Sequence, residues 1–313
     1  MSSIKILVAC HARSFVPVKA CLYPIQVGSA LADFRLDNML HDDEGDHISD
    51  RNSSYGELTA HYWMWKNLPA DFYGLFHYRR YFSFNPALLP SDPWGNTIYP
   101  RLDEAAMSEL NLNEAAMRAV IEPCDILAPA AIDLRTKEFK SVRAQYVGAP
   151  DHYGRDLDLI GEIIKQKRPE FEPFWRQYLD SDQAYFCNMF IMRREYFDRY
   201  SALLFELLEE HRRQTDVSSY SRRAGRVGGY LGERIFGAWY LEQKIRGQAK
   251  TKEMQRSLFL ASGEPAPYRR VPPLSTVIHR VFPQRSWRRN CLDRLIPEGS
   301  RRKRMLARLL GLI

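Results

Sequence analysis

The stretch Phe72-Tyr-Gly-Leu-Phe-His-Tyr-Arg-Arg-Tyr-Phe82 begins as an apolar run and then places two guanidinium groups and an imidazole among aromatic rings. Its first five residues have the content of a buried strand. His77, Arg79 and Arg80 follow where that strand ends. One arginine side chain can donate two hydrogen bonds to the oxygens of a phosphate, and aromatic faces pack against a base or a sugar. The stretch therefore predicts a strand that ends in an anion site. An exposed strand end with incidental charge explains the same pattern equally well.

A similar arrangement occurs near the start of the chain. Ile4-Lys-Ile-Leu-Val-Ala9 is a short aliphatic run that ends at His11 and Arg13. In an open α/β sheet, ligands bind at the carboxyl ends of the strands, where the loops gather. If the two strands are parallel neighbours, their basic and titratable side chains converge on one rim that suits a diphosphate.

Strand-like and helix-like stretches alternate along the chain, as an α/β sheet requires. Further strands are expected at Cys124–Ala128 and Ala184–Met192. Hydrophobic spacing and the prolines that end it predict helices at Tyr55–Trp65, Glu104–Ile121, Leu157–Lys167, Glu195–Gln214 and Tyr230–Ile245. Residues 85–101 are punctuated by Pro and Gly and are expected to form a loop.

The net charge is unevenly distributed. The 313 residues include 45 Lys or Arg and 38 Asp or Glu, and the resulting charge of +7 by itself suggests nucleic acid. Residues 269–313 hold twelve of the basic and two of the acidic residues, a net of +10, and residues 1–268 hold the remaining 33 and 36, a net of −3. We therefore expect a mildly acidic globular domain at 1–268 and a separate basic segment at 269–313.

The composition, 45% hydrophobic and 27% charged, excludes a wholly disordered, collagen-like or multi-span membrane chain. Five scattered cysteines without a C-x-x-C pair argue against a disulfide framework and a cysteine zinc site, so a reducing cytoplasm is expected. The sequence shows no signal peptide, and no window holds about 18 consecutive apolar residues. Any attachment to a membrane is therefore expected to be peripheral.

The basic segment contains two stretches, within 286–296 and 300–313, in which apolar residues recur at helical spacing with arginines between them. Basic amphipathic helices bind the surface of an anionic leaflet, where each Lys or Arg contributes about 1 kcal/mol. A nucleic-acid arm and a helix packed on its own domain are the alternatives. We favour the membrane and expect no nucleic acid as a partner, because an arm that only contacts phosphates does not need the apolar stripe.

Residues 48–65 combine helix-capping residues with a carboxylate and several aromatic residues. Asn52 or Ser53 as an N-cap, with the aromatic residues in the core, explains most of the segment. A functional interpretation places Asp50, Asn52 or Glu57 against the ribose or base of a nucleotide. Only one or two of these residues need be ligands.

Glu233 and Arg234 lie at the start of an otherwise apolar helix, after a glycine-rich turn. The helix dipole favours glutamate there, so capping accounts for Glu233 as well as function does. A carboxylate beside an apolar helix is equally a candidate general base. Asp182, just ahead of Asn188, is a second carboxylate candidate, and we count Asp182, Asn188 and Arg234 as secondary or acceptor-side candidates.

Metal sites have little support in the sequence. The acidic cluster of Asp42, Asp43, Glu44 and Asp46 is typical of a solvated loop rather than of an oxygen cage. A phosphate-binding P-loop, a dinucleotide-binding glycine motif and a nucleophile elbow are all missing, which disfavours NTPase, dinucleotide-dependent and hydrolase functions. We assign no metal ligands.

Several short motifs occur in an order and at a spacing that resemble one bacterial family. They are Ile48–Asn52, Glu57–Thr59, Tyr62–Asn67, Tyr73–Phe82, Asn188–Met192 and Gly229–Arg234. The chain resembles the capsular and exopolysaccharide biosynthesis glycosyltransferases whose hallmark is the H-Y-R-R-Y-F string. The resemblance covers residues 4–245 and leaves the basic segment out.

The resemblance implies a GT-A-like nucleotide-sugar-binding fold, with a mixed, mostly parallel central sheet flanked by helices. It also implies inverting transfer of galactofuranose from UDP-galactofuranose, the activity of some relatives. The expected acceptor is a hydroxyl of a growing, lipid-linked surface polysaccharide such as capsule, O-antigen or exopolysaccharide. The expected location is the cytoplasmic face of the cell membrane, with the anionic surface bound through 286–313.

The family's motifs also imply roles for individual residues. His77, Arg79 and Arg80 occupy the strand end where many GT-A enzymes keep a metal-binding D-x-D, which is missing here. Cationic side chains then take over part of the metal's work on the leaving diphosphate, and dependence on Mn²⁺ or Mg²⁺ is the alternative. Glu233 matches the Gly-x-x-x-Glu-Arg motif and is the expected catalytic base. The further donor-binding candidates are His11, Arg13, Asp50, Asn52 and Glu57.

Two other functions stay open at this point. One is a GT-A transferase that uses a different nucleotide sugar, because donor choice rests on a few pocket contacts that the sequence does not place. The other is a non-catalytic protein that binds anionic lipid or nucleic acid through its basic segment.

Overall fold

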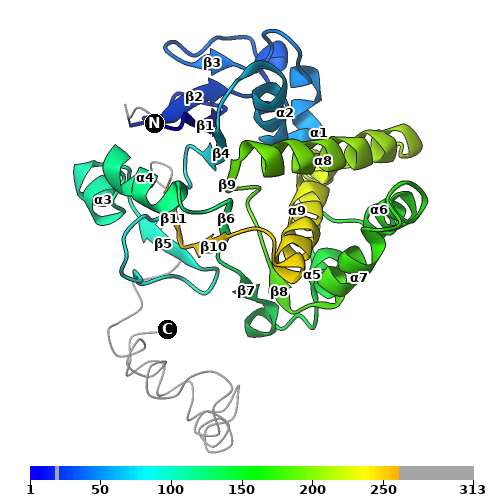
Figure 1. The fold of residues 1–313 in the computed structure, drawn as a ribbon. Coiled ribbons are helices and arrows are strands. Elements are labelled where there is room, and N and C mark those ends of the chain that lie inside the picture. Colours follow the sequence, from blue (N-terminus) through cyan, green and yellow to red (C-terminus); the bar gives the residue numbers. More distant parts are fainter. Residues whose placement is uncertain (18–20, 261–313) are drawn as a thin grey trace, which may run out of the picture.

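The computed structural model describes residues 1–17 and 21–260. Within them, seven strands form one sheet in the order β10-β6-β9-β4-β1-β2-β3 (Figure 1). These strands are β1 (Ile4–Cys10), β2 (Leu22–Gln26), β3 (Leu40–His41), β4 (Phe72–His77), β6 (Ile126–Pro129), β9 (Phe190–Arg193) and β10 (Thr251–Met254). The sheet is mixed and mostly parallel, because β9 runs antiparallel to both of its neighbours and every other pair is parallel.

The predicted pairing of the first two strands is confirmed. β1 and β4 are parallel neighbours, and the register places Ala9 opposite His77. β9 lies on the other side of β4, with Leu75 opposite Phe190. Because β9 is antiparallel, its first residue lies at the edge where β1 and β4 end. Three segments of the chain therefore converge on one edge of the sheet.

Two small sheets extend the structure beyond the central one. β5 (Asn96–Tyr99) pairs in parallel with β11 (Arg256–Phe259), and β7 (Ile132–Asp133) pairs antiparallel with β8 (Gln183–Ala184). β11 follows β10 after a single residue, so the chain passes directly from the central sheet into the β5–β11 pair.

Helices cover both faces of the central sheet (Figure 1). They are α1 (Asn52–Tyr55), α2 (Leu58–Asn67), α3 (Glu104–Glu109), α4 (Glu114–Ile121), α5 (Val142–Gly148), α6 (Gly154–Lys167), α7 (Glu172–Asp180), α8 (Arg194–Gln214) and α9 (Val227–Arg246). Side chains of a strand alternate between faces, so Leu7 joins the core under α2, α8 and α9, and Ile6 and Val8 join the core that includes α3 and α4.

Several predicted elements have different boundaries in the structure. The helix expected at Tyr55–Trp65 is split by Gly56, whose φ of 55° ends α1 before α2 begins. The helix expected at Glu104–Ile121 is also split, because Asn111 is left-handed and Asn113 caps the start of α4. Residues 85–101 are not entirely a loop, since they contain β5.

The strand expected at Ala184–Met192 is wrong over most of its length. β8 ends at Ala184 and β9 begins at Phe190, and the intervening residues are not part of a strand. Cys187 and Asn188 have φ angles of 82° and 46°, in the left-handed region, which interrupts the extended backbone. The apolar run was a sound indication of burial but not of strand.

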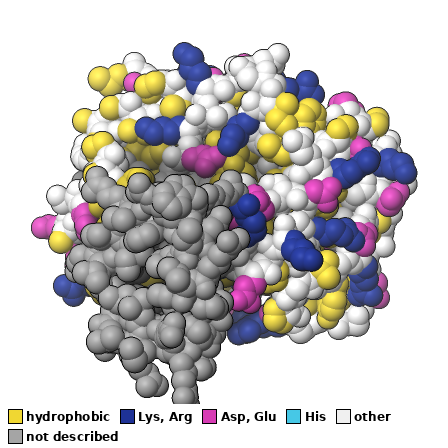
Figure 2. All heavy atoms as spheres, turned by 90° about the horizontal axis from the view of Figure 1, so that it is seen from below, with side chains coloured by type: hydrophobic (Ala, Val, Ile, Leu, Met, Phe, Trp, Pro, Cys, Tyr) yellow, Lys and Arg dark blue, Asp and Glu magenta, His cyan; other side chains and the backbone are white. Residues whose placement is uncertain are grey.

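The basic segment from residue 269, with its two expected helices, lies outside the described residues. No helix in the described part of the chain is long and apolar enough to cross a membrane. Figure 2 shows Lys, Arg, Asp and Glu side chains interspersed over the described part of one face. This mixture of signs fits the near-neutral charge of residues 1–268.

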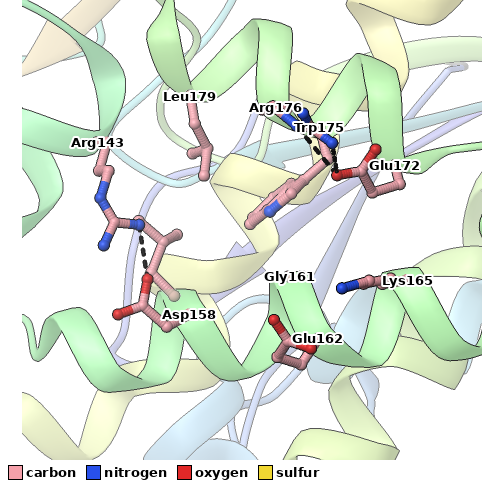
Figure 3. A pocket seen from close by; sticks show the side chains of 10 residues that line it. Arg143, Asp158, Gly161, Glu162, Lys165, Glu172, Trp175, Arg176 and Leu179 are labelled. Carbon is pink, nitrogen blue, oxygen red and sulfur yellow. Dashed lines mark hydrogen bonds and ion pairs between the residues drawn. The ribbon is translucent and has the colours of Figure 1, made fainter.

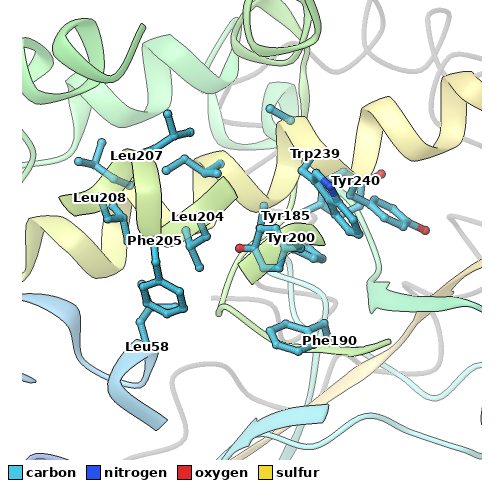
Figure 4. Close-up of a cluster of buried hydrophobic side chains, with 14 of the residues drawn as sticks. Leu58, Tyr185, Phe190, Tyr200, Leu204, Phe205, Leu207, Leu208, Trp239 and Tyr240 are labelled. Carbon is cyan, nitrogen blue, oxygen red and sulfur yellow. The ribbon is translucent and has the colours of Figure 1, made fainter. Parts of the chain in front are cut away.

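Helix α9 packs closely against α7 and α8. Figure 4 shows Tyr200 of α8 together with Trp239 and Tyr240 of α9 in this core. Tyr200, Trp239 and Tyr240 are all 3% exposed or less. Gly237 allows the close approach of Tyr178 from α7, because a Cβ atom added at Gly237 would overlap the Tyr178 ring. Alanine is the better helix former, so this glycine is present for packing and not for helix propensity.

We expect Gly237→Ala to destabilise the domain by roughly 1–3 kcal/mol, since the added methyl group displaces a buried ring in a filled core. Thermal unfolding should show a fall of about 2–4 °C for each kcal/mol. Gly225→Ala is the matched control, because apart from its own chain neighbours no heavy atom of the described residues lies within 4 Å of its added Cβ. Equal melting temperatures for the two variants would contradict this account of α9.

Candidate active site

The ends of β1 and β4 bring two histidines together. The ring centroids of His11 and His77 are 6.1 Å apart, and the His11 ring meets Tyr78 edge-on at 5.1 Å. His77 and Arg80 exchange backbone hydrogen bonds of 3.3 and 2.7 Å, which fold the chain into a tight turn directly after β4. This turn places both arginines of the hallmark string at the edge of the sheet.

Arg79 and Arg80 are anchored differently. Arg79 Nε donates to the Phe259 carbonyl oxygen at 2.8 Å, and the Phe259 N–H donates back to the Arg79 carbonyl at 2.8 Å, so β11 fixes this residue. Arg80 Nε is buried and has no hydrogen-bond partner among the described residues. Buried donors are normally paired, so Arg80 retains a donor for a ligand.

A third arginine reaches the same place from a distant part of the sequence. Arg226 is the N-cap residue of α9, and its charge lowers the pKa of both His11 and His77. Burial, followed by the charge of Arg80, lowers the pKa of His77 to about 3. Both imidazoles are therefore neutral at pH 7, and the positive charge comes from the guanidinium groups. We call His11, His77, Arg79, Arg80 and Arg226 the arginine rim.

Arg226 was missed in the sequence. It lies in the glycine-rich turn ahead of the predicted helix, and the prediction began that helix at Tyr230, three residues after its observed start. Its spacing could have indicated a role at the site. Arg226 lies four residues before Tyr230 and seven before Glu233, which places all three residues on one helix face.

Two predicted donor ligands lie away from the rim. The Arg13 side chain is 89% exposed and lies 3.8 Å from Asp37. Asp50 is exposed, and its charge acts on Arg212 at the end of α8. Neither contacts a rim residue in the described structure.

Of the two other predicted donor ligands, Asn52 and Glu57, only Glu57 has a contact with the rim among the described residues. Asn52 Nδ2 donates to the Gly56 carbonyl oxygen at 2.8 Å, which closes the turn between α1 and α2. Glu57 Oε2 is 3.8 Å from the Arg226 guanidinium, and Glu57 Oε1 accepts a 2.8 Å hydrogen bond from Asn188 Nδ2. Glu57 thus joins the rim to the segment that precedes β9.

Asp42 corrects one interpretation of the sequence. The acidic stretch that contains it is not simply a solvated loop, since Asp42 is fully buried. Its carboxylate accepts four hydrogen bonds of 2.5–2.9 Å, from the Gly28 and Ser29 N–H groups and from the Ser49 and Thr59 hydroxyls. Asp42 therefore holds the turn after β2 against α2.

Glu233 lies in α9 and faces the segment before β9. Its Oε1 accepts a 2.7 Å hydrogen bond from the Cys187 N–H, and its Oε2 accepts a 2.6 Å hydrogen bond from Arg234. The side chain is 18% exposed. Burial raises the pKa of Glu233 above the ordinary 4.5, and the charge of Arg234 opposes that rise. A carboxylate with a raised pKa and partial exposure has the properties of a general base.

Arg234 is the counter-ion of this carboxylate. It is 1% exposed and donates to Gln145 of α5 at 2.5 Å as well as to Glu233. Arginine is rarely buried without a partner, and Glu233 compensates the charge of Arg234, while Arg234 Nε has no hydrogen-bond partner among the described residues. Arg234 also links α9 to α5 through Gln145, a residue that no motif in the sequence singles out.

Asn188 and Cys187 position the two carboxylates. Asn188 Nδ2 donates to Glu57 and, at 3.1 Å, to the Gly229 carbonyl oxygen of α9, and the Cys187 N–H holds Glu233. Left-handed non-glycine residues cost energy and concentrate at functional sites. Asp182 lies elsewhere, 2.9 Å from Arg135, and does not contact Glu233 among the described residues.

The residues at the end of β4 do not fit a divalent cation. Hard cations prefer carboxylate and carbonyl oxygens, and the side chains there are an imidazole, a phenol and two guanidinium groups, with no carboxylate among them. No group of three or more His, Cys, Asp or Glu within residues 1–17 and 21–260 is placed to hold a metal ion. We therefore assign no rim residue as a metal ligand.

A hollow of about 310 Å³ between α5, α6 and α7 shares no residue with this site (Figure 3). Its lining mixes both charges, and Arg143 and Asp158 neutralise one another across it at 2.6 Å. Paired charges leave little net field for an ionic ligand. The hollow does not change the location of the candidate site.

Comparison with solved structures identifies the class of fold. The chain matches the apo structure of the bifunctional glycosyltransferase WbbM with a TM-score of 0.79 and 32% sequence identity. The match covers 83% of this chain and 46% of the WbbM chain, so this chain corresponds to less than half of that protein. The predicted fold, a mostly parallel GT-A-like sheet flanked by helices, is confirmed.

The chain belongs to the family defined by the domain of unknown function DUF4422, whose family model matches residues 5–244. The matched segment contains every residue of the rim together with Glu233 and Arg234, and it ends before the basic segment. No curated protein matches the sequence.

The left-handed pair before β9 generates a test. We expect Cys187→Gly to be neutral or to stabilise the domain by up to about 1 kcal/mol, because glycine tolerates positive φ and the Cys187 N–H is retained. Asn188→Gly removes the amide that joins Glu57 to Gly229 and should lower stability by about 1–3 kcal/mol. Thermal unfolding measures both changes. Equal losses in the two variants would contradict the assignment.

Proposed function

We propose that this protein is a glycosyltransferase that moves a sugar from a nucleoside diphosphate donor to an acceptor hydroxyl. The observation that supports this most is the connection of a partly buried carboxylate, Glu233, to the arginine rim through Cys187, Asn188 and Glu57. A glycosyltransferase structure 32% identical in sequence shares the fold that carries both groups. A base and an anion site within one network are the two parts that sugar transfer requires.

The arginine rim binds the diphosphate in this proposal. Arg80 supplies an unpaired buried donor, and Arg79 and Arg226 add positive charge at the same edge of the sheet. Guanidinium groups stabilise the negative charge that develops as the sugar–phosphate bond breaks. The neutral His11 and His77 contribute hydrogen bonds without adding charge.

Glu233 acts as the general base. The acceptor oxygen attacks the anomeric carbon as the bond from that carbon to the diphosphate oxygen breaks, and the electron pair leaves with the diphosphate. The acceptor proton passes to Glu233. In-line attack inverts the anomeric configuration, through the oxocarbenium-like transition state typical of glycosyl transfer.

The substrates are the finer part of the proposal. We name UDP-galactofuranose as the first donor to test, and a lipid-linked surface polysaccharide on the cytoplasmic face of the cell membrane as the acceptor. The resemblance of the H-Y-R-R-Y-F stretch and the basic residues of 286–313 support these choices. Thermal stabilisation by a panel of nucleoside diphosphates and nucleotide sugars tests the donor, because a ligand that binds the folded state raises the melting temperature.

Arg80→Ala should weaken binding of the stabilising nucleoside diphosphate about tenfold to a hundredfold, because a charge-assisted hydrogen bond to phosphate is lost. Isothermal titration in EDTA measures this, and Arg226→Ala should act in the same direction. Arg13→Ala is the control and should bind like the wild type. An absolute requirement for Mn²⁺ or Mg²⁺, or equal effects of the three substitutions, would contradict the role of the rim.

Glu233→Gln should retain nucleotide binding and lose transfer, with a fall in kcat of about a hundredfold or more, the usual contribution of a general base. In the wild type, kcat/KM should fall as the pH drops through the raised pKa of Glu233, so the acid limb should lie above pH 4.5. Transfer assays over a pH series measure both. Wild-type turnover in the variant would eliminate the base assignment.

A further inference from the structure

The rings of Tyr146, His152 and Tyr230 pack at tilted angles beside Arg234. The His152 ring lies 4.5 Å from the Tyr146 ring and 4.1 Å from the Tyr230 ring. Tyr146 belongs to α5 and Tyr230 to the first turns of α9. The Arg234 guanidinium lies over the Tyr146 ring at 5.2 Å and over the Phe186 ring at 5.1 Å. We call the rings of Tyr146, His152, Phe186 and Tyr230 the aromatic cluster.

The cluster contains buried polar atoms without partners. Tyr146 Oη, His152 Nδ1 and Arg234 Nε are buried and have no hydrogen-bond partner in the described part of the chain. Tyr146 and Arg234 are 1% exposed or less. Buried polar groups in folded proteins are almost always paired, and three unpaired atoms on neighbouring side chains indicate a ligand that carries hydroxyl groups.

His152 keeps one ring nitrogen, Nδ1, without a hydrogen-bond partner among the described residues. Burial, followed by the charge of Arg234, lowers its pKa to about 4, so the ring is neutral at pH 7. A neutral imidazole has one donor and one acceptor nitrogen. Together with a phenol and a guanidinium N–H, it offers the mixture of donors and acceptors that a polyhydroxyl compound matches.

The cluster and the arginine rim reach Glu233 by different routes. Cys187, Asn188 and Glu57 connect Glu233 Oε1 with the rim. Arg234 connects Glu233 Oε2 with the cluster. In a transferase, the base must contact the acceptor while the diphosphate lies at the rim. The aromatic cluster lies next to Glu233 and contains no rim residue, so it is available for the acceptor.

We infer that the aromatic cluster binds the sugar ring of the acceptor that presents its hydroxyl to Glu233. This inference rests on the proposed function. The apolar face of a sugar packs on aromatic rings, and its hydroxyls pair with the unpartnered atoms, as in sites that combine apolar walls with a few placed polar groups.

The test uses saturation-transfer NMR on the full chain with a saturating nucleoside diphosphate. The probes are methyl β-galactopyranoside, methyl β-glucopyranoside and methyl α-mannopyranoside. At least one should bind the wild type, and His152→Ala and Tyr230→Ala should each weaken that binding about fivefold to tenfold through loss of a ring contact. Tyr230→Phe keeps the ring and should bind like the wild type.

Tyr153→Ala is the matched control, because this neighbouring ring packs against Tyr220 instead. Melting-temperature shifts with the nucleotide report folding and donor binding in every variant. Three results overturn the inference: no probe binds the wild type, binding is unchanged in both alanine variants, or only binding of the nucleotide sugar is weakened. Failure of every nucleotide to stabilise the wild type contradicts the proposed function instead, so the two failures are distinguishable.

Discussion

The parallel pairing of β1 with β4, with antiparallel β9 on the other side of β4, determines where the charged groups of the candidate site lie. Ala9 lies opposite His77, and Leu75 lies opposite Phe190, so two strand ends and one strand beginning share an edge. Had β9 been parallel, the segment that holds Glu233 would lie at the opposite end of the sheet. The antiparallel strand is therefore the topological feature that brings Glu233, the proposed base, to the edge that carries the arginine rim.

The rim and Glu233 differ in how their charge depends on pH. The rim owes its charge to arginines, whose state does not change over the physiological pH range, because the nearby histidines are kept neutral by burial and by the arginines themselves. Burial raises the pKa of the Glu233 carboxyl above its ordinary value, and the charge of Arg234 opposes that rise. Binding of the diphosphate should thus depend weakly on pH, and proton removal strongly.

Much of this arrangement could be predicted from the sequence, and the failures have physical causes. The apolar run before His77 and the spacing of Glu233 were sufficient to place a strand end and a helical carboxylate. Hydrophobicity does not distinguish a buried strand from a buried left-handed turn, so the 185–189 segment was misassigned. The acidic composition around Asp42 concealed a buried carboxylate, since its four donors lie 7 to 17 residues away and come together only in the folded chain.

Helix α9 carries the three activities that the proposal needs. Arg226 at its N-cap contributes to the rim, Tyr230 one turn later contributes to the aromatic cluster, and Glu233 a further turn along is the base. Residues four and seven apart lie on one face of a helix, so a single rigid element sets the distances between them. Gly237 lets this face be fixed by packing against α7, because only a residue without a side chain admits the Tyr178 ring. The requirement for a glycine in the middle of α9 is therefore linked to the geometry of a site one to three turns away.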